Sequence, residues 1–174
     1  MVYIGVDPGK SGGVAVLTIE DNKATLDLYD VPDSEVDAVA IFEKIVKERG
    51  RAVQAVVENV HAFPSQGVSS MFTFGYWYGL VIAAMIANKI PFEKITPRKW
   101  IDSVVARTKG TMDKASWKKY LRDFAKVKFP YYAPKINLKN CDAVLLALYC
   151  RNVTSSRIEE MSVPVLPEQS NLPF

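Results

Sequence analysis

The sequence predicts an α/β fold centred on a five-stranded mixed sheet, with three antiparallel strands followed by parallel ones and helices on its faces. Residues 2–17 contain two apolar, β-branched runs joined by a short glycine-rich turn, which is the pattern of a β-hairpin. Residues 24–30 alternate apolar and polar side chains and predict a third strand. Apolar residues at helical spacing follow over 35–49, and another β-branched run over 52–57 ends in Glu58. This fourth strand returns after a crossover and is therefore expected to lie parallel to the first.

The remainder of the chain alternates helices with one short strand. Its longest helix is mostly apolar and is expected to be largely buried, and Gly75 and Gly79 within it indicate the close approach of another backbone. The expected elements are a helix over 70–88, a strand over 91–96, helices over 98–105 and 114–128, an irregular segment over 129–138 and a last helix over 141–150.

Length and composition fit one globular domain. The chain has 174 residues, of which 49% are apolar and 24% are charged, and this length is enough for a single sizeable core. We expect a domain over 1–151 and an extended or flexible, proline-containing tail over 152–174. No uninterrupted apolar run reaches the roughly 18 residues of a membrane span, so no membrane contact is expected. The chain begins directly with a strand, and Cys141 and Cys150 lie on opposite faces of one predicted helix, so a cytoplasmic location is expected.

Two acidic residues end strands that are expected to be neighbours. Asp7 ends the first strand and Glu58 ends the fourth. Parallel neighbours lie about 4.8 Å apart, so both carboxylates are expected at one edge of the sheet. Two like charges this close repel each other unless a cation joins them, and oxygen ligands of this type suit Mg²⁺ or Mn²⁺. Asp-Pro-Gly is also good turn chemistry, so a capping role for Asp7 stays open.

A third acid lies in the first turn of the last predicted helix. The residues after Asp142 are small and apolar, so this helix is expected to pack on the sheet and to bring Asp142 to the edge where Asp7 and Glu58 lie. A carboxylate in the first turn is favoured by the helix dipole in any case, so a purely structural role for Asp142 stays open.

Positive charge is concentrated in one part of the chain. The net charge is +3, but the stretch from Lys89 to Lys139 contains fourteen Lys or Arg residues against four acids. Basic residues interleaved with aromatic ones are typical of a surface that binds nucleic acid. Amphipathic helices with solvated basic faces are the alternative. The interleaved aromatic residues are Trp100, Trp117, Tyr120, Phe129, Tyr131 and Tyr132.

Taken in order along the chain, these features resemble the ribonuclease H-like fold and, within it, the RuvC-type Holliday junction resolvases, in particular their phage and bacterial members. The resemblance covers about residues 4 to 150. The matching pieces are Ile4-Gly-Val-Asp-Pro-Gly9, Val57-Glu-Asn-Val-His61, Gln66-Gly-Val-Ser-Ser-Met-Phe72 with Gly75 and Gly79, Thr96-Pro97 with Trp100, and Asp142-Ala-Val-Leu-Leu-Ala-Leu-Tyr149.

The resemblance implies a homodimeric endonuclease that makes symmetric cuts in a four-way DNA junction in the cytoplasm of a bacterial or phage-infected cell. It assigns Asp7, Glu58 and Asp142 as catalytic, metal-binding carboxylates, with Asp7 bridging two ions. Mg²⁺ is the expected metal, Mn²⁺ is expected to substitute for it, and no small-molecule cofactor is implied. In two-metal sites the ions stabilise both the attacking and the leaving oxygen of the phosphodiester.

One position departs from the family pattern. The family usually has a fourth acid shortly before the one on the last helix, and here the residue three positions before Asp142 is Lys139, with no acid nearby. An amide oxygen or a water could take one ligand place, or the protein could have reduced activity.

The resemblance also implies residues that contact DNA. The family carries a residue that wedges into the junction in the loop after the second acid, where His61 and Phe63 lie, although Phe63 could equally be buried under that loop. Lys114 or Lys118 is expected near the scissile phosphate, with plain surface charge as the alternative for each lysine. The candidate DNA-binding residues are His61, Phe63, Arg98, Lys99, Lys114, Lys118 and Lys119.

Two other functions stay open at this point. Another ribonuclease H-like nuclease, acting on flaps or on RNA–DNA hybrids, would use the same three carboxylates. A junction-binding protein with weakened catalysis would fit the lysine at position 139.

Overall fold

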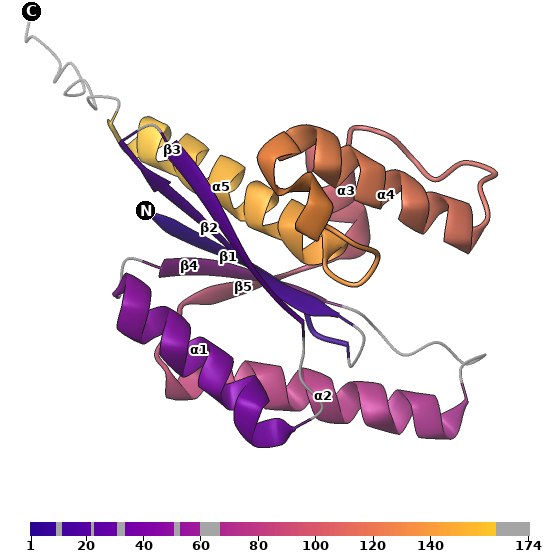
Figure 1. Ribbon diagram of the computed structural model, residues 1–174, viewed down its shortest axis with the longest axis horizontal. Coiled ribbons are helices and arrows are strands. Elements are labelled where there is room, and N and C mark those ends of the chain that lie inside the picture. The colour runs from indigo at the N-terminus through magenta and orange to yellow at the C-terminus, as the bar shows by residue number, and fades with distance from the viewer. Residues whose placement is uncertain (10–11, 22, 31–33, 51–52, 60–66, 163–174) are drawn as a thin grey trace, which may run out of the picture.

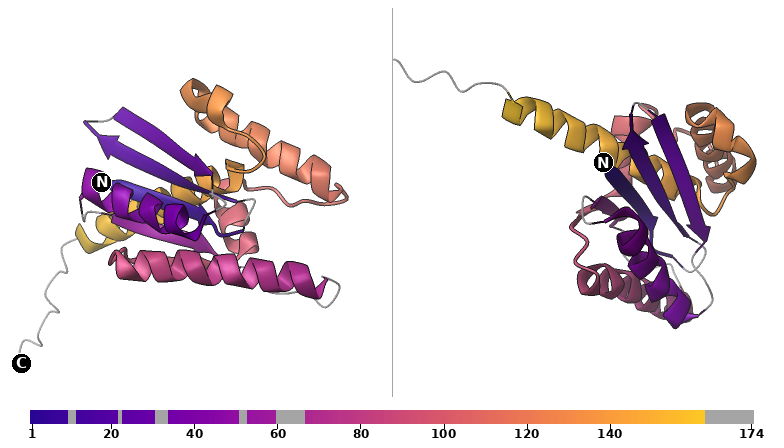
Figure 2. Two further views of the ribbon diagram at one scale, coloured as in Figure 1. Left: turned by 60° about the horizontal axis from the view of Figure 1, so that its bottom comes forward. Right: turned by 60° about the vertical axis from the view of Figure 1, so that its left-hand side comes forward.

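A five-stranded mixed sheet lies at the centre of the molecule, and the computed structural model describes residues 1–9, 12–21, 23–30, 34–50, 53–59 and 67–162. The strand order is β3-β2-β1-β4-β5, with α1 and α2 on one face and α3, α4 and α5 on the other (Figure 1 and Figure 2). The elements are β1 (Val2–Asp7), β2 (Gly13–Glu20), β3 (Lys23–Asp30), α1 (Glu35–Arg49), β4 (Val53–Glu58), α2 (Val68–Ala87), β5 (Phe92–Ile95), α3 (Pro97–Val104), α4 (Lys114–Lys128), the 3₁₀ helix η1 (Pro130–Lys135) and α5 (Cys141–Ser162).

The pairing of β1 fixes where the first two acids lie. β1 is antiparallel to β2, with Asp7 opposite Gly13, and parallel to β4, with Val6 opposite Val57. Asp7 and Glu58 are the next residues along these two parallel strands, so they lie side by side at the carboxyl end of the sheet. The predicted fold class and the parallel pairing of the first and fourth strands are therefore confirmed.

The central strands are buried on both faces, and their alternate residues enter two separate cores. Ile4 and Val6 of β1 pack with Phe42 of α1 and with α2. Tyr3 of β1 packs on the opposite face with Leu146 and other residues of α5. Since both faces are covered, the strand is an unbroken apolar run rather than an alternation.

Local capping signals account for most of the helix boundaries. The Ser34 hydroxyl accepts a hydrogen bond from the Asp37 amide at 3.4 Å, and Gly50 ends α1 with a φ of 70°. Pro97 occupies the first turn of α3. The Asp113 carboxylate accepts hydrogen bonds from the Ala115 and Ser116 amides at 2.8 and 3.0 Å and so begins α4, as predicted.

α5 lies so close to β1 that no side chain would fit at position 5 of the strand. A Cβ atom at Gly5 would stand 2.1 Å from the carbonyl oxygen of Ala143 and 2.2 Å from the amide nitrogen of Ala147. Only glycine therefore allows the helix backbone to rest directly on the strand. This contact places the first turn of α5, with Asp142, over the strand that carries Asp7.

We expect Gly5→Ala to destabilise the protein by about 3 kcal/mol or more, because even one methyl group meets backbone atoms that cannot move aside. The matched control is Gly67→Ala, where the added methyl group meets open space and the expected loss is within about 1 kcal/mol. Chemical denaturation of both variants measures the difference, and equal stabilities would contradict the packing argument.

The last helix is longer than predicted. The expected helix ended at Cys150 and the residues from 152 onward were expected to be extended or flexible, but α5 continues to Ser162. Val153 packs against the core, and Arg157 pairs with both carboxylate oxygens of Glu93 on β5, with the Nη2–Oε2 distance at 3.2 Å. These tertiary contacts stabilise a segment that has no apolar periodicity of its own. Residues 163–174 lie outside the described residues. The predicted irregular segment over 129–138 also contains a short helix, η1.

The prediction that the long apolar helix is largely buried is wrong. One side of α2 packs on the sheet through Trp77, Val81, Ala84 and Met85. The other side forms an exposed stripe, which includes Val68 at 82% and Phe72 at 77% exposure. The stripe comprises Val68, Phe72, Gly75, Tyr76, Gly79, Ala83 and Ile86.

Two further expectations about α2 are changed by the structure. Among the described residues of this one chain, nothing lies within 4 Å of a Cβ atom at Gly75 or Gly79, so they do not pack against the sheet, and the expected close approach is left to a partner helix. By length and composition, α2 is also apolar enough to cross a membrane, although the sequence was expected to contain no such segment. A helix that covers the core of a sheet meets the same criterion, and the buried side of α2 does this.

Candidate active site

The three predicted carboxylates line one cavity at the carboxyl end of the sheet. Asp7 comes from β1, Glu58 from β4 and Asp142 from the first turn of α5, and they border a cavity of about 520 Å³. Three lysines line the same cavity, together with the apolar side chains of Trp100, Ile101, Trp117 and Leu121. The lysines are Lys114, Lys118 and Lys139.

Glu58 is held in place by Trp100, which the sequence analysis had placed among the aromatic residues of the basic stretch and had not connected with the acids. The Trp100 indole Nε1 donates a hydrogen bond to Glu58 Oε1 at 2.9 Å, and both side chains are buried, with exposures of 1% and 8%. This bond fixes one carboxylate oxygen and leaves the second available. No local signal predicts the contact, because the two residues are 42 positions apart.

Burial gives two of the acids unusual proton affinities. It raises the pKa of Asp7 to about 6, with a further increase from the negative charge of Asp142. It raises the pKa of Glu58 to about 7, with a further increase from Asp7, whereas the hydrogen bond from Trp100 acts in the opposite direction. Both shifts arise mainly from desolvation, which disfavours the ionised carboxylates.

The third acid has a cationic partner. Lys118 Nζ forms a part-buried ion pair with Asp142 Oδ2. Burial, the largest single influence, lowers the pKa of Lys118, but the charge and hydrogen bond of Asp142 together with the nearby Cys141 and Asp7 raise it by more, so the pKa is raised and the lysine stays charged. The Cys141 thiol lies 3.4 Å from the other oxygen, Asp142 Oδ1.

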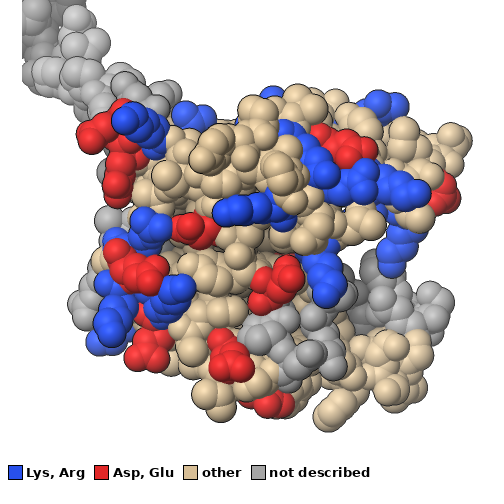
Figure 3. Space-filling model, in the orientation of Figure 1, with Lys and Arg blue, Asp and Glu red and all other residues tan. Residues whose placement is uncertain are grey.

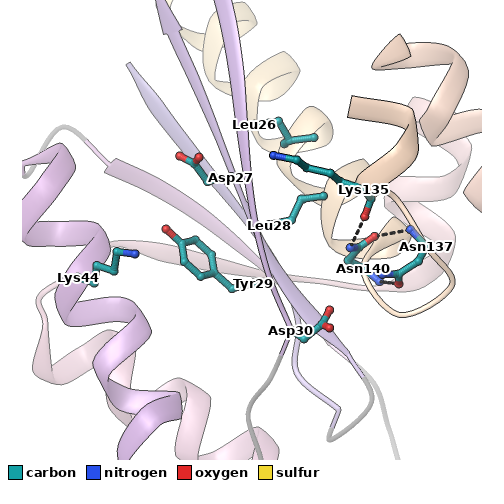
Figure 4. A pocket seen from close by; sticks show the side chains of 9 residues that line it. All are labelled: Leu26, Asp27, Leu28, Tyr29, Asp30, Lys44, Lys135, Asn137 and Asn140. Carbon is teal, nitrogen blue, oxygen red and sulfur yellow. Dashed lines mark hydrogen bonds between the residues drawn. The ribbon is translucent and has the colours of Figure 1, made fainter. Parts of the chain in front are cut away.

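The turn before α5 is fixed by an asparagine network that the sequence analysis did not identify (Figure 4). Asn140 is 3% exposed, its Oδ1 accepts from the Asn137 amide at 2.9 Å, and its Nδ2 donates to the Lys135 carbonyl at 3.1 Å. The Lys139 amide donates to Asn137 Oδ1 at 2.7 Å. The backbone of Lys139 is therefore held beside the cavity. A second hollow of about 450 Å³ lies along β3 next to this turn.

The predicted DNA-binding residues fall into three groups. Lys114 and Lys118 line the cavity. Lys119, Lys99 and Arg98 are exposed and do not line it, and Arg98 faces Asp102 at 3.6 Å. His61 and Phe63 lie outside the described residues.

A basic strip continues from the cavity over the surface of α4 (Figure 3). Arg122, Lys126 and Lys139 line an open groove that shares Leu138 and Lys139 with the cavity. The predicted basic surface is therefore present on this side of the molecule.

The aromatic residues of the basic stretch are mostly unavailable to nucleic acid. Trp100 and Trp117 belong to the core, and Tyr120 stacks between Trp117 and Phe124 with centroid distances of 5.3 and 6.3 Å. Tyr131, at 87% exposure, is the clear exception.

The donor set suits a hard divalent cation. Among the residues that the structure describes, no three His, Cys, Asp or Glu side chains stand in a ready-made ligand arrangement. The half-buried Asp7 and the buried Glu58 nevertheless place carboxylates on neighbouring strands, where desolvation raises their pKa values and disfavours the ionised forms in the absence of a cation. Oxygen donors of this type prefer Mg²⁺ or Mn²⁺.

Two solved structures share this fold. *Thermus thermophilus* RuvC in complex with a Holliday junction substrate matches with a TM-score of 0.60 and 17% sequence identity, over 91% of this chain and 96% of that one. A second structure of *Thermus thermophilus* RuvC matches with a TM-score of 0.60 and 18% identity, over 91% and 97% of the two chains. No protein-family model and no curated protein sequence matches the chain.

The fold is therefore ribonuclease H-like, with the arrangement found in RuvC. At 17–18% sequence identity the similarity defines the fold only. Function has to be inferred from the residues that line the cavity.

We expect the metal-free protein to lose stability as the pH rises from about 4.5 to 7. Glu58 has a higher pKa in the folded chain than in the unfolded one, so the folded state binds more protons in this range and folding weakens as they leave. At about 1.4 kcal/mol per pKa unit, the loss attributable to Glu58 is roughly 3 kcal/mol.

Denaturation in EDTA at pH 5 and pH 8 measures this effect. Glu58→Gln keeps an acceptor for the Trp100 N–H and removes the ionisation, so the variant is expected to be more stable than the parent at pH 8 and close to it at pH 5. If the free energy of unfolding changed with pH in the same way for both proteins, the Glu58 carboxylate would not be destabilised by burial.

Proposed function

We propose that the protein is a metal-dependent endonuclease that resolves four-way DNA junctions by paired, symmetric cuts. The observation that carries the proposal is the convergence of Asp7, Glu58 and Asp142 with lysines in one cavity at the carboxyl end of the sheet. The RuvC neighbour whose structure contains a Holliday junction substrate supports branched DNA as the substrate class.

The chain's own residues would divide the work of phosphodiester hydrolysis. Asp7 and Glu58, with Asp142, would hold the divalent metal, Mg²⁺ or in its place Mn²⁺. When bound, such a metal activates water and stabilises the charge that develops on the phosphate oxygens. Trp100 orients Glu58, and the apolar walls formed by Trp117 and Leu121 limit water around the carboxylates.

The lysines would act on the DNA phosphates. Lys114 and Lys118 lie one helical turn apart on α4 and both line the cavity, where positive charge stabilises a reacting phosphate. Arg122 and Lys126 continue the same basic surface along the groove. Contacts of this kind give affinity and salt sensitivity without reading the base sequence.

The cleavage assay uses a labelled synthetic four-way junction with Mg²⁺ or Mn²⁺, beside linear duplex, flap and RNA–DNA hybrid. We expect paired nicks on the junction, and a loss of about 100-fold or more in rate for Asp7→Asn, because the variant removes a charged donor from the reacting centre. The matched control is Asp27→Asn, which lies on β3 away from the cavity.

The other outcomes separate the competing functions. Cutting of the flap or hybrid instead of the junction would identify another ribonuclease H-like nuclease. Tight junction binding without cutting under either metal would identify a binding protein, the function that the lysine at position 139 favours.

We further propose that the exposed stripe of α2 binds a second copy of the chain. α2 has no charged residue over its 20 positions, and its stripe combines large apolar side chains with two unobstructed glycines, Gly75 and Gly79. Small residues between large ones allow two helices to approach closely. A symmetric dimer would also provide two active sites for two symmetric cuts.

Phe72→Glu is expected to convert the dimer to a monomer, because the variant places a charge in the centre of an apolar contact. Analytical ultracentrifugation measures the mass of the species in solution. Val127→Glu is the control, since Val127 is equally exposed, at 76%, but lies on α4 across the sheet. A monomeric parent protein, or a dimer that survives Phe72→Glu, would contradict the assignment.

A further inference from the structure

The cavity contains as many lysines as carboxylates. Three negative side chains face three positive ones, so the lining is formally neutral before any metal binds. The expectation of two divalent ions came from a family pattern with a fourth acid, and in this chain a lysine replaces that acid.

The charges are not evenly distributed across the cavity. On the α5 side, Asp142 is already neutralised by its ion pair with Lys118. On the strand side, Asp7 and Glu58 form no ion pair among the residues that the structure describes, and Glu58 accepts a hydrogen bond only from the neutral Trp100. The need for a cation is therefore greatest between β1 and β4.

Lys139 adds positive charge on the α5 side. Its amide is bound to Asn137 and the next residue is the buried Asn140, so its backbone position is fixed. Lys139, which is exposed, is among the residues that line both the cavity and the adjoining basic groove. A dication placed beside Asp142 would meet the ammonium group of Lys118, which already pairs with that carboxylate, and like charges at close range repel each other.

We propose that each active site takes one divalent ion, held mainly by Asp7 and Glu58, and that Lys118 and Lys139 occupy the Asp142 side in place of a second ion. The inference rests on the proposed nuclease function for its chemistry, but it concerns ion number, which is measurable without DNA. In this arrangement the lysine ammonium groups would face the scissile phosphate of the bound DNA from the α5 side.

The test counts bound Mn²⁺ per chain by titration calorimetry and electron paramagnetic resonance on the full chain without DNA. We expect one Mn²⁺ for the parent protein and two for Lys139→Asp, in which an acid replaces the lysine. The matched control is Lys126→Asp, which makes the same charge change in the neighbouring groove, outside the cavity, and is expected to keep one ion.

Two further variants locate the ion. Asp7→Asn is expected to weaken Mn²⁺ binding by roughly tenfold or more, as loss of a principal donor requires, whereas Asp142→Asn is expected to change it by less than about threefold. Circular dichroism of each variant confirms that it is folded. Equal losses for Asp7→Asn and Asp142→Asn would overturn the placement of the ion.

The outcomes also distinguish this inference from the proposed function. Two ions on the parent protein, or one ion on Lys139→Asp, would overturn the inference while leaving junction cleavage unaffected. One ion on a protein that cuts no junction would support the ion count and overturn the proposed function. No bound ion at millimolar Mn²⁺ would overturn both.

Discussion

The direct contact between α5 and β1 is the constraint on which the rest of the molecule depends. Gly5 allows the backbone of the helix to rest on the strand at Ala143 and Ala147, so the two elements behave as one unit. One core forms around this contact, and the first turn of α5 carries Asp142 to the end of β1 where Asp7 lies. The cavity is therefore a product of backbone packing and does not depend on a flexible loop for the positions of these two acids.

The same packing creates an electrostatic cost at the cavity. Two carboxylates lie at the ends of parallel strands, where burial desolvates them and the charge of Lys118 offsets this only in part, so their pKa values rise. Destabilised, buried groups of this kind are common at functional sites, since the arrangement that disfavours the free protein favours its ligand-bound form. Asp142, which lines the same cavity, is instead stabilised by its ion pair with Lys118.

Much of the fold could be predicted because its signals are local. The β-branched runs, the turn chemistry and the caps at Ser34, Pro97 and Asp113 determine where elements begin, and the rule for parallel crossovers then brings Asp7 and Glu58 together. Apart from the local asparagine network around Asn140, the contacts that were missed connect residues far apart in the chain. The Trp100–Glu58 hydrogen bond spans 42 positions, and the Glu93–Arg157 ion pair, which stabilises the extension of α5, spans 64.

The error over α2 has a different origin. Its composition indicates burial, but α1 and α2 share one face of the sheet, so only one side of α2 finds a surface to cover. Composition shows how apolar a helix is. It does not show how much of the sheet surface is left for that helix to cover once its neighbours have packed. The roles of His61 and Phe63 stay predictions.

The parallel register of β1 and β4 has a consequence for ion choice. Donors on adjacent hydrogen-bonded strands cannot spread apart to suit a larger ion, since their spacing is set by the ladder that joins the strands. Mg²⁺ requires short, nearly ideal oxygen contacts, whereas Ca²⁺ accepts longer and more variable ones. Under the proposed metal-dependent function, carboxylates held at this strand spacing would favour the smaller Mg²⁺ over Ca²⁺ at Asp7 and Glu58.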